Sequence, residues 1–317
     1  MESIIYNLSN DDYHRGDGYR DYISSTQLKA YAKSPKFAKY MLDHPQEETD
    51  AMIFGALFHD LMASMAEYNG EWDGVKAWRF NYAVFEPPTN SKTGQPYGAN
   101  TKAYAEAYAK FKEDNADTLI ASQEDLNLVY DMCHSLWCKC GATSEQVRKL
   151  LKWGKPEVSI FYETEDGIKI KIRPDLLTPK KIIDWKTTAL DDLTEESINR
   201  TILRYGYHIS AAMYQYVYHA VSGKWLDFYL IFVQKQPPYD CVMVDMANYG
   251  YRYLPDVDMV IPGPGALEFQ KLLDLHTKCV KTNTWPGAET FIPGDRYRIM
   301  EIEPPRYYAT KFIEDDY

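Results

Sequence analysis

The sequence has 317 residues and a formal net charge of −11, from 35 lysines and arginines against 46 aspartates and glutamates. With 45% hydrophobic and 26% charged residues it has the composition of a globular protein, which excludes a disordered or fibrous chain. No apolar run reaches the roughly 20 residues that span a bilayer, so we expect no membrane contact. The acidic balance argues only weakly against nucleic-acid binding, because such binding depends on a local basic patch.

The first 20 residues lack a basic start followed by an apolar stretch, so no secretory signal is expected. Five cysteines, an odd number, argue against a disulfide framework and favour a reducing cytoplasm. Cys133, Cys138 and Cys140 lack the two-plus-two spacing of a zinc or cluster site, which favours structural thiols. The expected location is therefore the cytoplasm.

Residues 1–23 are polar and predict irregular structure, and a helix begins after them. Ser24 followed by Gln27 is typical of a capping box, and Pro35 predicts a break or kink further along. Four lysines in this segment form either a solvated basic face or a surface that contacts phosphates: Lys29, Lys33, Lys36 and Lys39.

Residues 51–66 predict an amphipathic helix, because their large apolar side chains recur at helical spacing. His59 lies beside this apolar stripe, where a lone histidine is usually a core residue. The prolines and glycines of 67–100 predict a long loop, and 101–153 predicts two helices.

From Glu157 onward the pattern alternates and predicts a sheet. Residues 158–162 and 168–173 are expected to form a hairpin through Asp166-Gly167. The elements expected after the hairpin are strands 181–186, 225–234 and 241–245 and helices 207–222 and 264–281.

A cluster of charged residues in this sheet carries the chemistry. Asp184 and Lys186 are two apart on a strand, so both side chains leave the same face, and a turn can bring Asp175 beside Asp184. Two converging carboxylates repel unless a cation lies between them, and hard oxygen ligands suit Mg²⁺ or Mn²⁺. Lys186 would then position or deprotonate an attacking water or neutralise a phosphate, and Glu157 could add a carboxylate.

A D…D-x-K pattern alone arises easily by chance on a surface hairpin. Its setting is more specific, because a hairpin, a strand with paired Asp and Lys, and an amphipathic helix follow in that order. This order predicts the core of the PD-(D/E)xK nucleases, an α/β restriction-endonuclease-like fold with a mixed central sheet flanked by helices.

Seven short motifs then show a closer resemblance. They are Ser24-Ser25, Ser34-Pro35, AMIFGALFH at 51–59, Glu157-Val158-Ser159, Arg173-Pro174-Asp175, Asp184-Trp185-Lys186-Thr187-Thr188 and Tyr207-His208. In this order and spacing the chain resembles the RecE-type exonucleases (exonuclease VIII), over about residues 10–235.

The resemblance implies a metal site and a catalytic lysine. Its metal ligands would be His59, Asp175 and Asp184, with the carbonyl of Trp185 as a further one. Lys186 would be the catalytic lysine, and Glu157, named above, the acidic residue before the core strand.

The chain departs from the family at one position of the helix after the catalytic strand. The family's Gln-x-x-x-Tyr would place glutamine at position 210, where this chain has Ser210, while Tyr214 is retained. The adjacent Gln215 points about 100° away on a helix, so the substrate contact of the family glutamine is altered.

The resemblance further implies a cytoplasmic, phage- or prophage-encoded exonuclease that degrades linear double-stranded DNA from the 5′ end. It also implies a toroidal homo-oligomer around DNA and a RecT-type annealing partner. We expect one nuclease domain over 1–317, with a helical portion at 1–153, a catalytic core at 154–245 and an extension at 246–317.

A ring could keep its acidic surface outside and line its channel with basic residues. The residues expected to contact substrate are Lys29, Lys36, Arg173, Ser210 and Tyr214, and the wider channel set adds Lys33, Lys149, Lys152, Lys169 and Lys171.

Two alternatives stay open. One is a RecB-like or Cas4-like nuclease of different polarity, of which the Cas4 type carries an iron–sulfur cluster. The other is a DNA-binding scaffold with a decayed nuclease core, although His59, Asp175, Asp184 and Lys186 are all present.

Overall fold

The computed structural model describes residues 3–44, 49–116, 118–138 and 141–287, and a mixed five-stranded sheet organises them. Its strand order is β10-β9-β8-β7-β4, in which β8 and β9 are parallel and the other neighbours are antiparallel. The strands are β4 (Lys155–Pro156), β7 (Leu176–Leu177), β8 (Lys181–Thr188), β9 (Asp227–Gln234) and β10 (Cys241–Asp245). The predicted mixed α/β sheet is confirmed.

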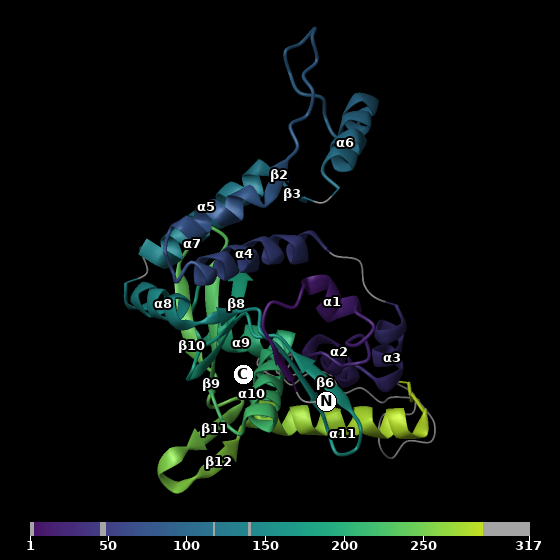
Figure 1. Cartoon of the computed structure of the whole chain (residues 1–317), viewed down its shortest axis with the longest axis vertical. Helices are drawn as coiled ribbons and strands as arrows, with labels where there is room; N and C mark the ends of the chain where they lie inside the picture. Colours follow the sequence, from purple (N-terminus) through teal and green to yellow (C-terminus); the bar gives the residue numbers. More distant parts are fainter. Residues whose placement is uncertain (1–2, 45–48, 117, 139–140, 288–317) are drawn as a thin grey trace, which may run out of the picture.

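A helical layer covers one face of this sheet. Its helices are α4 (Asp50–Glu67), α5 (Asp73–Phe80), α7 (Gln123–Cys138) and α8 (Ala142–Trp153). Their apolar side chains form one core with Ile183, Trp185 and Ile231 from the strands. Figure 1 shows α4 next to the strands, with α5 and α7 beyond it.

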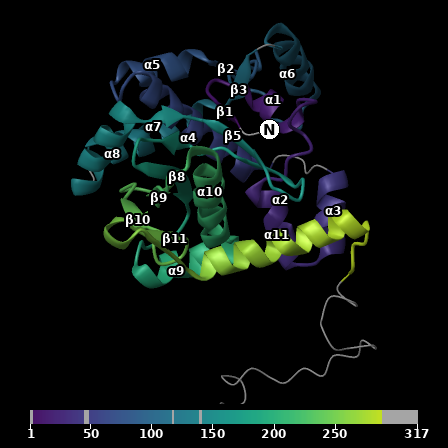
Figure 2. The ribbon, with the colours of Figure 1, turned by 60° about the horizontal axis from the view of Figure 1, so that its bottom comes forward.

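The other face packs against helices from both ends of the chain. They are α2 (Ser25–Lys29), α3 (Pro35–Asp43), α9 (Glu195–Tyr205), α10 (Tyr207–Ser222) and α11 (Pro264–Thr282). The core here includes Ile182 of β8 and Phe228 and Leu230 of β9, as the two-residue period of a strand requires. Figure 2 shows α11 crossing the end of α10 and running toward α2 and α3.

The predicted hairpin forms, but it lies in a separate sheet. Strand β5 (Ser159–Glu163) pairs on one side with β6 (Lys169–Ile172) and on the other with β1 (Ser3–Ile5). The expectation of irregular structure over 1–23 is therefore wrong, and this segment also contains α1 (Asn10–Arg15). It is ordered because Tyr13 and Tyr22 pack on Phe161.

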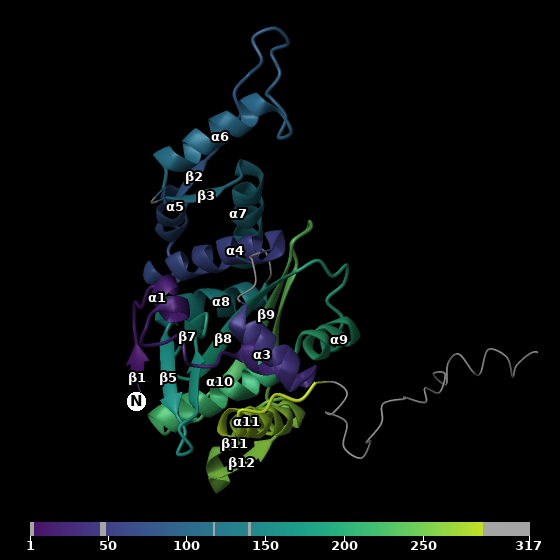
Figure 3. The ribbon, with the colours of Figure 1, turned by 90° about the vertical axis from the view of Figure 1, so that its right-hand side faces the viewer.

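Residues 67–153 contain more structure than predicted. The expected loop contains α5 and β2 (Tyr82–Val84), and the expected two helices are three, with α6 (Lys102–Asp114) preceding β3 (Leu119–Ala121). Strands β2 and β3 pair in parallel, and Figure 3 shows α6 standing beyond them, away from the central sheet. Short strands of three residues leave too little alternation to be predicted.

The remaining elements are short connections. Pro35 begins α3 after the cap Ser34 and does not kink a longer helix, and η1 (Ala30–Ala32) joins α2 to α3. A ribbon of β11 (Tyr251–Leu254) and β12 (Met259–Pro262), linked by η2 (Pro255–Val257), was not predicted. Within the described ranges, no helix combines the length and apolar character needed to cross a membrane.

Alanine substitutions at two glycines of the helical layer should change the free energy of unfolding in opposite directions. A Cβ at Gly74 would lie 2.7 Å from Met65 Cα, because α4 and α5 pack backbone to backbone there, whereas a Cβ at Gly55 would meet nothing within 4 Å. We expect Gly74→Ala to lower the free energy of unfolding by about 1–3 kcal/mol. Gly55→Ala in the α4 interior should raise it by about 0.5–1 kcal/mol. Urea denaturation measures both, and equal effects would contradict the packing.

Candidate active site

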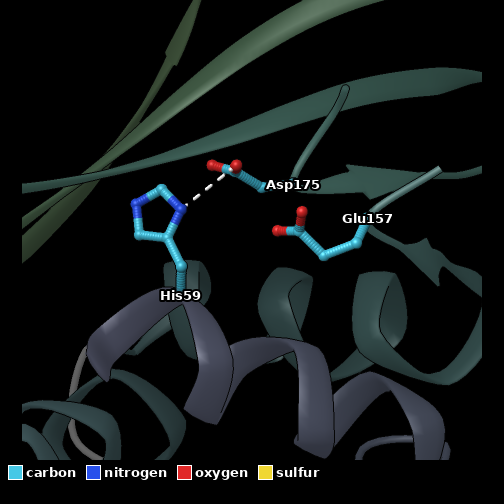
Figure 4. A group of neighbouring side chains, drawn as sticks. All are labelled: His59, Glu157 and Asp175. Atoms are coloured by element: carbon cyan, nitrogen blue, oxygen red, sulfur yellow. Dashed lines mark ion pairs between the residues drawn. The ribbon is translucent and has the colours of Figure 1, made fainter. Parts of the chain in front are cut away.

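Three side chains from separate elements converge between the helical layer and the central sheet. His59 extends from α4, Asp175 directly precedes β7, and Glu157 lies between β4 and β5. His59 Nδ1 lies 3.1 Å from Asp175 Oδ1, and one ligand atom from each of the three lies within 4.8 Å of the others. Figure 4 shows the imidazole and the two carboxylates pointing toward one another.

A short strand creates the position of Asp175. Strand β7 pairs with β8 only as far as Ile183, so the next outward N–H of β8, that of Trp185, has no strand partner on this side. That N–H donates to Asp175 Oδ2 at 2.6 Å. The N–H and C=O of one strand residue point to the same side, which places the Trp185 carbonyl on the same sheet edge as the Asp175 carboxylate.

Asp184 and Lys186 leave β8 on the same face, as predicted, and this face is the one toward α10. Lys186 Nζ lies 2.7 Å from Asp184 Oδ2. Asp184 also hydrogen-bonds Asp175. Burial raises the pKa of Asp184 to about 7 against the opposing effect of Lys186. Although Asp175 is also buried, His59 and Lys186 lower its pKa. The charge of this pair therefore lies on Asp175 and the shared proton on Asp184.

Glu157 is held by a buried arginine. Arg173 Nε lies 2.8 Å from Glu157 Oε2 and also donates to the Glu157 carbonyl. Burial raises the pKa of Glu157 to about 7, with Asp175 adding to it. The Arg173 side chain is only 10% exposed and also donates to the Leu8 carbonyl, so the guanidinium orients Glu157 and does not face a channel.

Lys171 is a second correction to the predicted basic channel. Its side chain is buried, and its Nζ donates to the carbonyls of Tyr13 and Tyr19 at 2.7 and 3.0 Å. Lys171 therefore ties the N-terminal segment to β6. Lys36, in contrast, is exposed on α3.

A fourth acidic residue, not predicted from the sequence, lies beside the site. Asp60 follows His59 on α4, accepts a hydrogen bond from Tyr82 Oη, and acts electrostatically on Glu157. Burial raises the pKa of Asp60. A helix places adjacent residues about 100° apart, so no periodicity links Asp60 to the ligand set, and Tyr82 lies in the segment expected to be a loop.

The α10 residues of the family motif lie on the sheet side of that helix. Ser210 is buried, and Tyr214 Oη donates to the Arg173 carbonyl at 3.4 Å. Gln215 is buried on another side, where its amide binds the Leu226 carbonyl and both the N–H and the C=O of Tyr251. Gln215 therefore anchors β11 and does not replace a glutamine at position 210.

The two residues of the Tyr207-His208 motif have separate roles. His208 Nε2 lies 2.9 Å from Glu268 Oε2, which joins α10 to α11 away from the metal-binding group. The Tyr207 ring lies 5.1 Å from Lys186 Nζ and 5.8 Å from Lys29 Nζ.

The donor set fits a divalent cation. His59, Glu157 and Asp175 form the one group of three or more His, Cys, Asp and Glu side chains, within the described ranges, that is compact enough to hold a metal ion. Asp184 is bonded to Lys186 and Asp175 at the border of this group. Burial raises the pKa of Asp184 and Glu157 although Lys186 and Arg173 pair with them, and a cation ligated by oxygen and imidazole would stabilise both carboxylates further.

This fold and site define the class of PD-(D/E)xK nuclease-like domains. Residues 24–289 match the family described as a PDDEXK-like domain of unknown function (DUF3799), and the chain belongs to that family. No curated protein matches the sequence. A solved structure from Eubacterium rectale, provisionally described as an exonuclease, superposes with a TM-score of 0.49 and 14% identity, covering 96% of this chain and 99% of that chain. Membership of this family confirms the predicted PD-(D/E)xK superfamily. It does not identify the RecE type within that superfamily.

If the site binds a metal ion, the ion should stabilise the folded protein, and this stabilisation should depend on Asp175. At about 100 times its Kd, Mg²⁺ or Mn²⁺ should raise the free energy of unfolding by about 2.7 kcal/mol. Asp175→Asn should remove most of this increment, because it neutralises the charged member of the carboxyl pair. Thermal unfolding with and without metal measures it. Asp166→Asn, in the exposed hairpin turn, is the control, and an equal increment in both variants would place the metal elsewhere.

Proposed function

We propose that this protein is a metal-dependent deoxyribonuclease that degrades linear double-stranded DNA from its ends. The observation that supports this most is the convergence of Asp175, Asp184 and Lys186 at one end of β8, with His59 and Glu157 beside them. Carboxylates that hold a cation next to a lysine can hydrolyse a phosphodiester, because the cation activates water and both cations stabilise charge on the phosphate.

In the proposed hydrolysis, one set of residues would hold the metal ion and another would stabilise charge. His59, Asp175 and Asp184, with the Trp185 carbonyl and the neighbouring Glu157 carboxylate, would hold Mg²⁺. That ion, when bound, polarises the phosphodiester and lowers the pKa of water. In the reaction the water oxygen bonds to phosphorus as the bond to the leaving oxygen breaks.

Lys186 acts here as a cation. Asp184 and Asp175 raise the pKa of Lys186 although its burial opposes this, so the amine stays protonated at neutral pH. Its ammonium can orient the water and stabilise the negative charge that develops on the phosphate oxygens.

The finer assignment follows from the RecE-type motifs. They support 5′→3′ polarity, 3′ single-stranded products, a RecT-type annealing partner, a toroidal homo-oligomer, a phage or prophage origin and a cytoplasmic setting. They equally support Mg²⁺ as the ion and one nuclease domain over 1–317.

The Cas4-like alternative predicts an iron–sulfur cluster built on cysteines. Cys133 and Cys241 are buried, Cys138 is exposed, and Cys140 lies outside the described residues. The metal-binding group in the described part of the chain includes no cysteine. A colourless purified protein supports the exonuclease proposal, and an iron–sulfur absorption spectrum supports the alternative.

Digestion of end-labelled DNA tests the proposal. With Mg²⁺ the protein should release a 5′ label from a linear duplex and leave a closed circle of the same sequence intact. Asp184→Asn and Lys186→Met should each slow cleavage by at least about 100-fold, because each removes charge placed for the transition state. Lys180→Met, an exposed residue before β8, should cleave normally.

Each other outcome has a distinct meaning. Cutting of the circle would indicate an endonuclease, and release of a 3′ label would indicate the opposite polarity. Binding of DNA without cleavage under any metal would indicate a decayed scaffold.

A further inference from the structure

Two lysines that are far apart in the sequence meet at one aromatic ring beside the candidate active site. Lys186 Nζ lies 5.1 Å from the centre of the Tyr207 ring, and Lys29 Nζ, from α2, lies 5.8 Å from it. Tyr207 is the first residue of α10, so the two cations approach the start of this helix from β8 and from the N-terminal helices.

The Lys29 side chain is held in this position by the backbone. Its stem passes over Gly206, where an added Cβ would lie 2.8 Å from Lys29 Cδ. Its Nζ donates to the Tyr205 carbonyl at 3.2 Å. Gly206 also has a φ of +64°, which lets α9 end and α10 begin without an intervening loop. The glycine therefore provides both the bend and the space that Lys29 occupies.

The charge of Lys29 is not matched by an acid. Among the described residues it forms no ion pair, whereas Lys186 pairs with Asp184 at 2.7 Å. An ammonium has three donors, and one neutral carbonyl uses only one of them. Placing a second cation near Lys186 costs electrostatic energy, which an anionic ligand between the two would recover.

We propose that Lys29 is a substrate-positioning residue that binds a backbone phosphate of the DNA strand next to the one being cut. This inference depends on the proposed nuclease function and adds a residue from the N-terminal helices to its site. Both ammonium groups lie near the Tyr207 ring, and in this assignment Lys186 serves the reacting phosphate and Lys29 its neighbour. A phosphate contact of this kind fixes the strand without reading its sequence.

DNA binding with EDTA present, so that no strand is cut, tests the proposal by fluorescence anisotropy at several salt concentrations. Lys29→Met should weaken binding about 5- to 10-fold and reduce the slope of log K against log salt by about 0.9, the loss of one duplex phosphate contact. Lys29→Arg should restore both. The matched control is Lys180→Met, which removes an exposed cation outside the predicted basic channel and should change neither.

A second variant displaces the Lys29 stem without removing a charge. Gly206→Ala should reproduce the weakened binding and the smaller salt slope, and thermal unfolding checks its fold, because alanine at a φ of +64° also strains the junction of α9 and α10. In the cleavage assay, Lys29→Met should raise KM by the same factor and leave kcat within about twofold, since the contact is equal in ground and transition states.

The outcomes distinguish a failure of this inference from a failure of the proposed nuclease function. If the wild-type protein neither binds nor cleaves DNA, the proposed function fails and the inference with it. If the wild type cleaves DNA but Lys29→Met binds with an unchanged salt slope, Lys29 is a structural cation on Tyr207 and only this inference is overturned. Equal losses in Lys29→Met and Lys180→Met would likewise overturn it.

Discussion

The site depends on how the chain keeps two buried acids, Asp175 and Asp184, side by side. Asp175 stays ionised because the Trp185 N–H and His59 both hydrogen-bond or pair with it, and Asp184 is held by Lys186. Without these partners, the two carboxylates would repel in a low-dielectric interior. The result is an arrangement that is stable without metal and already close to the ligand geometry that a cation needs.

The architecture can be understood from this requirement. Strand β7 is only two residues long, and its early end gives Asp175 access to the backbone of β8. The helical layer delivers His59 to one side of that opening, and α10 closes the other side near Lys186. Strand β8, which carries Asp184 and Lys186, pairs with β7 on one side and is fixed on the other by its parallel pairing with β9.

The sequence predicts the parts of the site that follow strand and helix periodicity. Asp184 and Lys186 share a face because a strand repeats every two residues, and order along the chain was enough to indicate the fold class. Periodicity cannot show which charges are used internally. Arg173 and Lys171 look like DNA contacts in the sequence, but Arg173 holds Glu157 and Lys171 binds backbone carbonyls.

Long-range pairing was also beyond prediction. The separate sheet of β1, β5 and β6 and the Asp60–Tyr82 hydrogen bond join segments that no local pattern connects. The meeting of Lys29 with Tyr207 depends on a bend at one glycine, Gly206, and on the packing of α2 against α10.

Proton release on metal binding, measured by calorimetry in buffers of different ionisation enthalpy, tests the central claim most directly. Asp184 and Glu157 have pKa values of about 7 in the metal-free site, and Asp175 raises the pKa of the His59 imidazole against the effect of its burial, so all three groups hold protons at pH 6. A cation must displace these protons. The account predicts release of about two to three protons per ion at pH 6, falling as the pH rises through these pKa values, with affinity rising over the same range. Metal binding at pH 6 without proton release, and with affinity independent of pH, would contradict it.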